Sequence, residues 1–302
     1  MMTDRINISK VLLLMVAVMT VSSCAKPLAK FTLEREDARA PTNVTFDNQS
    51  EKAESYLWDF GDGNTSTESE PEHKYYLSGN YTITLKAMKG KKESMTTQTL
   101  AVEAPHDCTV EMETSLGNMT IKLYDETPKH RDNFIKLAET GYYDGLLFHR
   151  VIEGFMVQGG DPNSKNAKKG ARLGSGGPGY TVPAEFTDQY AHVKGALCAA
   201  RQGDNVNPEK ASSGSQFYIV DGRDVSADVL DGMEKRKGII YPAEVRTAYL
   251  ENGGTPFLDQ DYTVYGMVVK GLDVLDKIAQ VKTSGADRPE EDVKILKVRV
   301  VK

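Results

Sequence analysis

The stretch at residues 148–161, F-H-R-V-I-E-G-F-M-V-Q-G-G-D, determines how the rest of the chain is interpreted. Two short apolar runs flank a Glu-Gly break, which predicts two strands joined by a tight turn. Arg150 lies in the first run, and Phe155, Met156 and Gln158 lie in the second. These four side chains include no nucleophile, acid–base pair or metal ligand set. They are suited to holding an apolar ring while donating hydrogen bonds to an amide.

This stretch resembles the signature of cyclophilin-type peptidyl-prolyl cis-trans isomerases. The matching blocks are F-H-R at 148–150, G-F-M at 154–156 and Q-G-G-D at 158–161, in order and at the family spacing. A further block, G-S-Q-F-Y at 214–218, follows where the family has it. Because two matching regions in register are more specific than either alone, we expect the family fold, a closed antiparallel β-barrel capped by two helices.

The resemblance also implies which residues form the site. Arg150 would donate a hydrogen bond to the twisted prolyl amide, because a guanidinium stays charged and presents a rigid fork of donors. Gln158 would bond the substrate backbone, and Gln216 would position Arg150 or the peptide. The catalytic residues implied are Arg150, Phe155, Gln158 and Gln216, and the substrate-binding residues implied are Met156, Ala200, Arg201, Tyr218, Phe257, Leu258 and Tyr262.

Four of these positions depart from the commoner family residue. Tyr218 stands where the family usually has phenylalanine, Phe257 where many relatives have tryptophan, Arg201 where asparagine is common and Tyr262 where histidine is frequent. If the residue at 201 acts through its backbone, activity survives the change. His149 is interpreted as structural, since prolyl isomerisation needs no proton transfer.

Length and composition limit the number of domains and the classes of partner. The chain has 302 residues, enough for about two domains, and a formal net charge of −6. A mildly acidic balance without a basic block argues against nucleic-acid binding. No metal site or cofactor is predicted. Cys108 and Cys198 each lie in an apolar run, so we expect free, buried thiols, although an exported chain could pair them.

Residues 1–23 are predicted to be a signal peptide. Arg5 and Lys10 precede an apolar run at 11–21, which is too short to cross a bilayer as a helix. The run leads into Val-Ser-Ser-Cys, with the cysteine at position 24. We therefore expect export from the cytoplasm and exclude these residues from the fold.

The sequence around Cys24 resembles a bacterial lipobox. The resemblance implies that Cys24 is lipidated and anchors the mature protein to a membrane of the cell envelope. Lys26, in place of aspartate, gives no inner-membrane retention signal and so favours the outer membrane, while its face stays open. The alternative is an ordinary cleaved signal in which Cys24 is incidental. Residues 24–37 would serve as anchor and tether, with their last part entering the first strand.

Residues 38–104 are predicted to form a small β-sandwich. Short alternating runs are separated by Gly/Asn turns, and one tryptophan, Trp58, falls in an apolar run. The segment resembles a PKD domain, an immunoglobulin-like module that could also bind a partner protein. The residues that carry this resemblance are Trp58-Asp59-Phe60-Gly61-Asp62-Gly63, Pro71, His73, Tyr75, Gly79, Tyr81 and Thr82.

Asp59 and Asp62 leave a calcium site open as an alternative. Two carboxylates do not supply the six to eight oxygen ligands that calcium takes, so shaping a tight turn is the preferred interpretation. Glycan binding is a weaker alternative, because Trp58 is the only tryptophan and is expected to be buried.

A short linker at 105–107 leads into the cyclophilin-like segment, residues 108–302. Thr127-Pro128 predicts a helix start, with threonine as the N-cap. Residues 195–200 are small and would let a bound peptide approach closely. Residues 221–256 look like an insertion that carries two short helices. The chain is therefore expected to be mainly β.

Two classes of function follow. The first is an isomerase that acts on proline-containing polypeptides and assists the folding of exported proteins. The second is an adaptor lipoprotein that uses the cyclophilin groove and the PKD module to bind a peptide or partner without important turnover. The complete set of Arg150, Phe155, Gln158 and Gln216 favours the isomerase.

Overall fold

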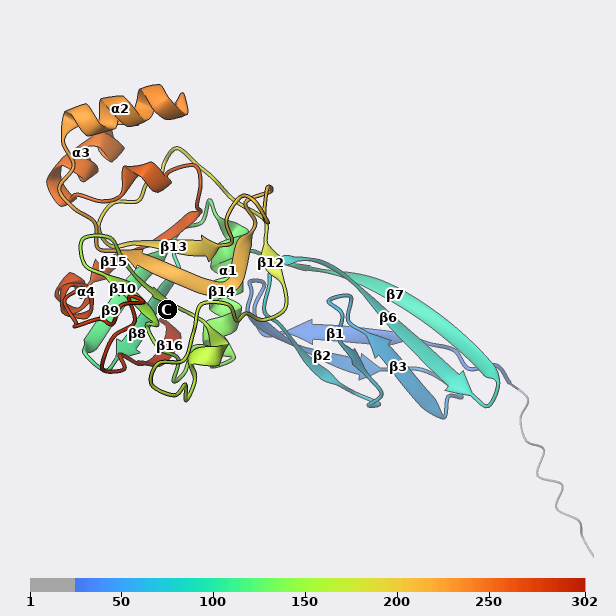
Figure 1. Ribbon diagram of the computed structural model, residues 1–302. Helices are drawn as coiled ribbons and strands as arrows, with labels where there is room; N and C mark the ends of the chain where they lie inside the picture. Colours follow the sequence, from blue (N-terminus) through green and yellow to red (C-terminus); the bar gives the residue numbers. More distant parts are fainter. Residues whose placement is uncertain (1–24, 302) are drawn as a thin grey trace, which may run out of the picture.

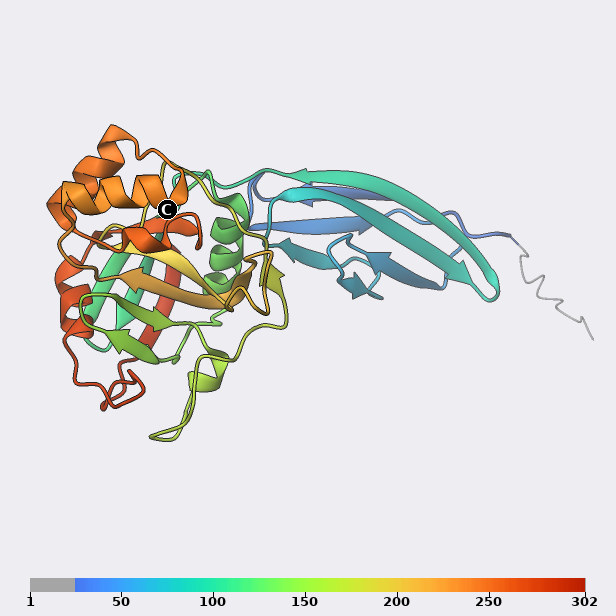
Figure 2. The same cartoon turned by 45° about the horizontal axis from the view of Figure 1, so that its top comes forward.

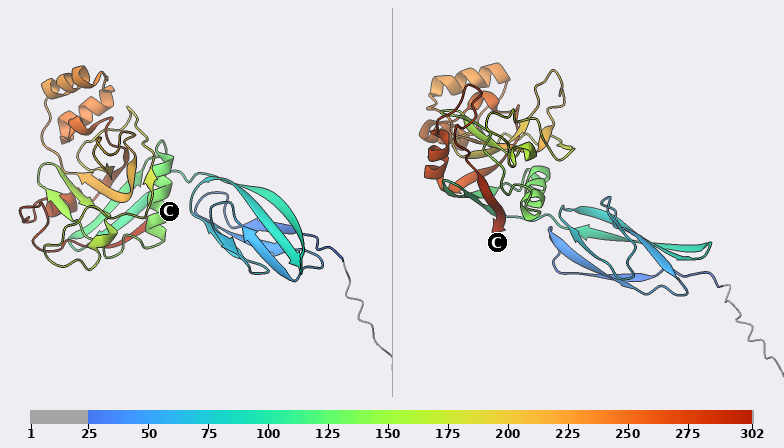
Figure 3. Two further views of the ribbon diagram at one scale, coloured as in Figure 1. Left: turned by 45° about the vertical axis from the view of Figure 1, so that its right-hand side comes forward. Right: turned by 60° about the horizontal axis from the view of Figure 1, so that its bottom comes forward.

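The computed structural model describes residues 25–301, which form two β-rich domains arranged end to end (Figure 1). The first domain contains β1–β7, and the second contains the remaining strands and the four α-helices of the described chain. Figure 3 shows from two further sides that a narrow sandwich extends from a broader second domain. The predicted signal peptide and Cys24 lie outside the described residues.

The first domain is a sandwich of two sheets, with strand orders β1-β2-β5 and β4-β3-β6-β7. Alternation builds its core, since Ile83 and Leu85 of β6 are buried while their neighbours are not. Trp58 is buried, with its ring centroid 5.1 Å from that of Phe31 and 5.3 Å from that of Phe46. The predicted sandwich is confirmed. Its strands are β1 (Phe31–Arg35), β2 (Thr42–Asn48), β3 (Ser55–Asp59), β4 (Thr65–Ser66), β5 (Glu72–Tyr75), β6 (Gly79–Lys89) and β7 (Lys92–Val102).

The sandwich begins earlier than position 38. β1 lies within the segment 24–37 that was predicted to be a tether, and it pairs with β2 along its whole length. Phe31 is 2% exposed and belongs to the core. Phe31 and the half-buried Leu33 alternate with the exposed Thr32 and Glu34, but five residues give too few repeats to fix the bounds of the strand from the sequence.

A nine-stranded antiparallel sheet forms the second domain, with the order β10-β11-β14-β13-β15-β9-β8-β16 and β12 paired to β14. The two strands predicted in the 148–161 stretch are β10 and β11. Figure 2 shows how this sheet curves around its core. The strands are β8 (Thr109–Thr114), β9 (Gly117–Leu123), β10 (Arg150–Ile152), β11 (Met156–Gly159), β12 (Thr181–Val182), β13 (Ala196–Arg201), β14 (Ser212–Val220), β15 (Val264–Lys270) and β16 (Ile295–Val301).

This sheet is a half-barrel, and the prediction of a closed barrel is wrong. β10 and β16 are the two ends of the pairing order and do not form a ladder with each other. An isolated bridge between Leu147 and Lys294 and the bond from Phe148 N to Val293 O (3.0 Å) connect the segments beside them. Those segments are irregular, so no strand register continues across the gap.

Two helices pack on the half-barrel core through buried faces that include Phe134 and Leu275. The predicted cap, Thr127, makes no side-chain cap bond. Instead, the Glu185 carboxylate accepts the first-turn N–H of His130 at 3.0 Å, so a distant segment caps this helix. Within residues 25–301, no helix has both the length and the apolar character needed to cross a bilayer. The two helices are α1 (Pro128–Glu139) and α4 (Leu272–Ala279).

The 221–256 segment forms the two short helices predicted there, α2 (Ala227–Lys237) and α3 (Ala243–Asn252). Ser226 caps α2 by accepting the N–H of Val229 at 3.4 Å. The buried side chains of Leu230 and Tyr249 share one cluster. Both helices lie on the side of the second domain away from the sandwich (Figure 1), and they are followed by the short helix η2 (Pro256–Leu258).

Polar side chains near the linker connect the two domains. Ser78, just before β6, donates from its N–H (3.2 Å) and its hydroxyl to the carboxylate of Asp132 in α1. Asp132 also pairs with the buried Arg131 at 2.8 Å. Lys74 of β5 pairs with Glu139 of α1 at 3.2 Å. Helix α1 is therefore both part of the isomerase-like core and the docking element for the sandwich.

Candidate active site

The strand register brings the predicted site residues together. In the β10–β11 pair Arg150 lies opposite Gln158, and in the β11–β14 pair Gln158 lies opposite Tyr218. Residues that are directly opposite each other in neighbouring strands point to the same face of a sheet. Three side chains from three strands therefore meet on one face, although 68 positions separate the first from the last in the sequence.

A cavity of about 190 Å³ lies on this face. Its walls combine apolar side chains with the guanidinium and amide of the β10–β11 pair. The lining residues are Arg150, Phe155, Met156, Gln158, Ala200, Arg201, Tyr218, Leu258 and Tyr262. All nine were predicted as site residues, so the structure gathers them from β10, β11, β13, β14 and the segment that follows α3.

The two remaining predicted residues, Gln216 and Phe257, stand beside the cavity. Gln216 accepts a bond from Gln158 Nε2 at 3.1 Å and donates to the carbonyl of Gly176 at 2.8 Å. Gln216 therefore orients the Gln158 amide and fixes the backbone of the 162–179 loop at Gly176. Phe257 is 47% exposed and stacks on Phe155 with ring centroids 5.8 Å apart, which places it at the rim.

Arg150 is held at one end and open at the other. Its Nε bonds a carboxylate oxygen of Asp287 at 3.3 Å, and both side chains are partly exposed. Its two terminal nitrogens make no hydrogen bond to any residue in the 25–301 range. The guanidinium therefore keeps donors available at the cavity. Asp287 was not predicted, because it lies in an irregular loop far from Arg150 in the sequence and carries no local motif.

Arg201 is committed to the protein. Its Nε donates to the Asp261 carbonyl at 2.6 Å, and its Nη1 pairs with Asp204 at 2.5 Å. The guanidinium also lies over the ring of Tyr262, 4.5 Å from the centroid, a favourable cation–π geometry. Its charge is thus satisfied within the fold, and its departure from the common asparagine adds no free cation to the cavity.

His149 stays out of proton chemistry. It is buried, and burial lowers the pKa of its ring to about 4, despite the opposing charge of Asp161. The ring is therefore neutral at pH 7. In residues 25–301 no group of three or more His, Cys, Asp or Glu side chains could hold a metal ion. Cys108 and Cys198 are free and buried, as predicted.

His192 and Asp259 were also missed by the sequence analysis. The hydroxyl of Tyr218, whose side chain lines the cavity, bonds His192 Nε2 at 3.0 Å, and His192 Nδ1 bonds Asp259 at 2.6 Å. The only sequence signal was the tyrosine at 218 in place of phenylalanine, since a buried hydroxyl needs a partner.

Comparison with known proteins supports the same assignment. Residues 109–300 match the cyclophilin type peptidyl-prolyl cis-trans isomerase family, and residues 24–104 match the PKD domain family. The chain is 38% identical over 195 residues to a Staphylococcus haemolyticus protein named as a peptidyl-prolyl cis-trans isomerase. The alignment covers 63% of this chain and 90% of that protein. It is 41% identical over 197 residues to a Streptococcus pyogenes protein named as a bifunctional phosphatase and peptidyl-prolyl cis-trans isomerase. That alignment covers 63% of this chain and 38% of the other protein.

A solved structure is also similar. It is a cyclophilin type peptidyl-prolyl cis-trans isomerase of Cryptosporidium parvum, with a TM-score of 0.47 and 22% identity, covering 65% of this chain and 98% of that one. The family match spans most of the chain and includes the whole cavity described above. The chain therefore belongs to the cyclophilin-type peptidyl-prolyl cis-trans isomerase family, with a PKD domain ahead of its isomerase domain.

Proposed function

We propose that the second domain isomerises prolyl peptide bonds of exported polypeptides, with Arg150 as the residue that acts on the rotating bond. The barrier to rotation is about 18–20 kcal/mol, because the amide nitrogen shares its lone pair with the carbonyl. In the twisted state the lone pair returns to nitrogen. A donor aimed at that nitrogen would stabilise the twisted state more than the planar one, which is the condition for catalysis.

The observation that carries this proposal is the placement of the Arg150 guanidinium. It lines the cavity beside Met156, with Nε bonded to Asp287 and the terminal nitrogens unoccupied by other described residues. One end of the rigid donor fork is thus fixed, and the other is left for substrate. Gln158, whose amide is oriented by Gln216, would bond the peptide backbone nearby.

The rest of the cavity supports a proline ring as the occupant. Phe155, Met156 and Leu258 supply apolar surface, and Tyr218 supplies an aromatic wall. Burial of an apolar ring on such walls is favourable, while a neutral amide and an arginine satisfy the polar peptide groups on either side. Proline-containing polypeptides are therefore the proposed substrate class.

The setting of the reaction is part of the proposal. The signal-like residues 1–23 and the lipobox-like cysteine at 24 support an exported lipoprotein of the cell envelope, with the outer membrane favoured. The first described segment, coloured blue, begins at the end of the sandwich that points away from the isomerase domain (Figure 1). An anchor at Cys24 would therefore leave the PKD domain as a spacer between membrane and active site, with a surface that could also bind a partner protein.

The test is a prolyl isomerisation assay on residues 25–302, with the wild type compared with Arg150→Ala and Arg150→Lys. We expect Arg150→Ala to lower kcat/KM by roughly 100-fold, the usual cost of removing one transition-state donor. Arg150→Lys should recover only part of the loss, because an ammonium lacks the planar fork.

Circular dichroism would confirm that each variant is folded, and Arg299→Ala, a partly exposed residue of β16 that does not line the cavity, would serve as a control with wild-type activity. A folded wild type without catalysis would overturn the proposal. The adaptor hypothesis would then replace it, since a groove that binds peptides need not turn them over.

A further inference from the structure

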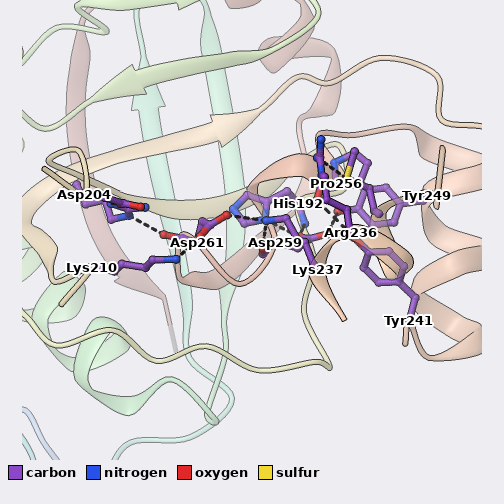
Figure 4. A network of polar contacts seen from close by, with 12 residues as sticks. His192, Asp204, Lys210, Arg236, Lys237, Tyr241, Tyr249, Pro256, Asp259 and Asp261 are labelled. Atoms are coloured by element: carbon purple, nitrogen blue, oxygen red, sulfur yellow. Dashed lines mark hydrogen bonds and ion pairs between the residues drawn. The ribbon is translucent and has the colours of Figure 1, made fainter. Parts of the chain in front are cut away.

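The insertion places two tyrosine hydroxyls on one buried carboxylate (Figure 4). The Tyr241 and Tyr249 hydroxyls donate to Asp259 Oδ2 at 2.7 and 2.6 Å. The other oxygen, Oδ1, accepts the N–H of His192 at 3.0 Å and bonds its Nδ1 at 2.6 Å. Asp259 therefore receives four hydrogen bonds, two of them from residues within the 221–256 insertion.

His192 links Asp259 to Tyr218, which lines the cavity. With Nδ1 directed at the carboxylate, Nε2 is the ring atom that faces the Tyr218 hydroxyl. The Tyr218 hydroxyl bonds Nε2 across 3.0 Å. Both residues are buried, and the Tyr218 side chain forms part of the cavity wall. An unbroken chain of hydrogen bonds thus runs from the insertion to the proposed proline pocket.

Asp259 acts as a fixed negative centre. Burial opposes its ionisation, but the hydrogen bonds from His192 and the two tyrosine hydroxyls outweigh that cost and lower the pKa of Asp259 below the usual value of 3.8. The residue also follows Leu258 directly, at the end of η2. Holding its carboxylate therefore holds the backbone that presents Leu258 to the cavity.

A second contact from the insertion grips the same segment. Lys237, the last residue of α2, bonds the Asp259 carbonyl and pairs with the Asp261 carboxylate at 2.6 Å. The Asp261 carbonyl in turn accepts from Arg201. The backbone between Leu258 and Tyr262, the next lining residue, is therefore bonded from both sides. Figure 4 shows Lys237, Asp259 and Asp261 in one network.

We propose that the 221–256 insertion sets the shape of the proline pocket, with Tyr241, Tyr249 and Asp259 as positioning residues that act through Tyr218 and Leu258. The inference rests on the proposed isomerase function, since it assigns these residues to that pocket. None of them contacts Arg150, so they affect how well the ring is held and leave the action on the rotating bond intact. Their loss should therefore change KM and spare kcat.

The experiment compares the wild type with the double variant Tyr241→Phe/Tyr249→Phe, which removes both hydroxyls and keeps both rings. Exchange NMR with the peptide Ala-Ala-Pro-Phe gives KM and kcat separately. We expect KM to rise roughly threefold to tenfold, the effect of losing the positioning of about one hydrogen bond, with kcat within twofold of wild type. Arg150→Ala should show the opposite split, with a low kcat and a nearly unchanged KM.

Tyr218→Phe provides the coupling test. If the chain acts through the Tyr218 hydroxyl, adding Tyr218→Phe to the double variant should raise KM no further, whereas independent effects would multiply. Tyr81→Phe, which removes a hydroxyl from the sandwich, is the matched control and should leave both constants unchanged. If the double variant does not fold, the single variants, each retaining one hydroxyl on Asp259, take its place.

An unchanged KM in a folded double variant would overturn the inference, and so would a loss of kcat comparable to that of Arg150→Ala. Multiplying effects in the triple variant would also overturn it, because the inference requires the Tyr218 hydroxyl as well as the Leu258 backbone. These outcomes differ from failure of the proposed function. That failure would appear as absence of isomerisation by the wild type itself.

Discussion

The cavity has a strand wall, which carries Arg150 and Gln158, and an insertion wall, which carries Tyr218 and Leu258 and is supported by the 221–256 insertion, and the two walls differ in how their charged groups are paired. On the strand wall, formed by β10 and β11, Arg150 pairs with Asp287 alone among residues 25–301, and their side chains are 43% and 45% exposed. On the insertion wall, the His192–Asp259 pair has side chains 0% and 4% exposed, and four hydrogen bonds satisfy the carboxylate. The strand wall keeps donors free for a substrate. On the insertion wall the Asp259 carboxylate is bonded by Tyr241, Tyr249 and His192, so its position is fixed by contacts within the fold.

Physical chemistry predicts different costs for disturbing each wall. An ion pair in solvent is worth roughly 0–1 kcal/mol, because water screens it and both side chains lose freedom. Removing one partner of a buried pair costs roughly 3–5 kcal/mol, because uncompensated donors stay in a dry site. The insertion wall should therefore matter most for stability, and the strand wall for catalysis.

The largest expected effect on stability is that of Asp259→Asn. The amide keeps the shape of the side chain but loses the charge that accepts four donors, so we expect the free energy of unfolding to fall by about 3 kcal/mol at pH 7. Urea denaturation followed by far-UV circular dichroism would measure it. Asp231→Asn, an exposed aspartate in α2 that pairs with Arg246, is the matched control and should change stability by less than about 1 kcal/mol.

Acid should reduce the difference in unfolding free energy between the wild type and Asp259→Asn. The pKa of Asp259 is lower in the folded protein than its usual value of 3.8. Its carboxylate therefore stabilises the native state above that value, and the stabilisation disappears as pH falls through the folded pKa. The difference in unfolding free energy should be smaller at pH 3 than at pH 7. An equal difference at both pH values would show that the charge of Asp259 does not stabilise the insertion wall.

A smaller effect is expected on the strand wall from Asp287→Asn. The exposed pair contributes little stability, but its loss frees one end of the Arg150 fork. We expect kcat/KM to fall by roughly twofold to threefold, with the free energy of unfolding within about 0.5 kcal/mol of wild type. Asp273→Asn, which breaks an exposed pair with Lys277 in α4, should leave kcat/KM unchanged. A stability loss as large as that of Asp259→Asn would remove the contrast between the walls.

The sequence predicted the lining of the cavity far better than its supports. Most lining residues match the family pattern, and Tyr218, Arg201 and Tyr262 stand at family positions with a different side chain, so resemblance located them. Asp287 and His192 act through contacts with residues distant in the chain, and no local pattern encodes such pairing. The two insertion tyrosines lie outside the family pattern, so only the fold reveals that their hydroxyls meet on Asp259.

The fold itself shows the same limit. Alternation predicted strands in both domains, because burial on one face imposes a period of two. It could not predict whether β10 and β16 would join, since both edges end in irregular backbone whose register the alternation does not specify. β1 was predicted only as a strand entered by the last part of the 24–37 segment, because Phe31 and Leu33 give too few repeats to fix its bounds.

The smallest expected effect lies at the joint between the domains, where Ser78→Ala removes the hydroxyl that bonds Asp132. Neither residue reaches the cavity, so kcat/KM should match wild type within experimental error. The N–H of Ser78 and the Lys74–Glu139 pair remain, so the joint should loosen without separating. Small-angle X-ray scattering should show a broader distribution of distances between domains, while Ser94→Ala inside the sandwich should not. A change in KM would mean that the sandwich, like the insertion, shapes the pocket, and the contrast between the two walls would then extend across the domain boundary.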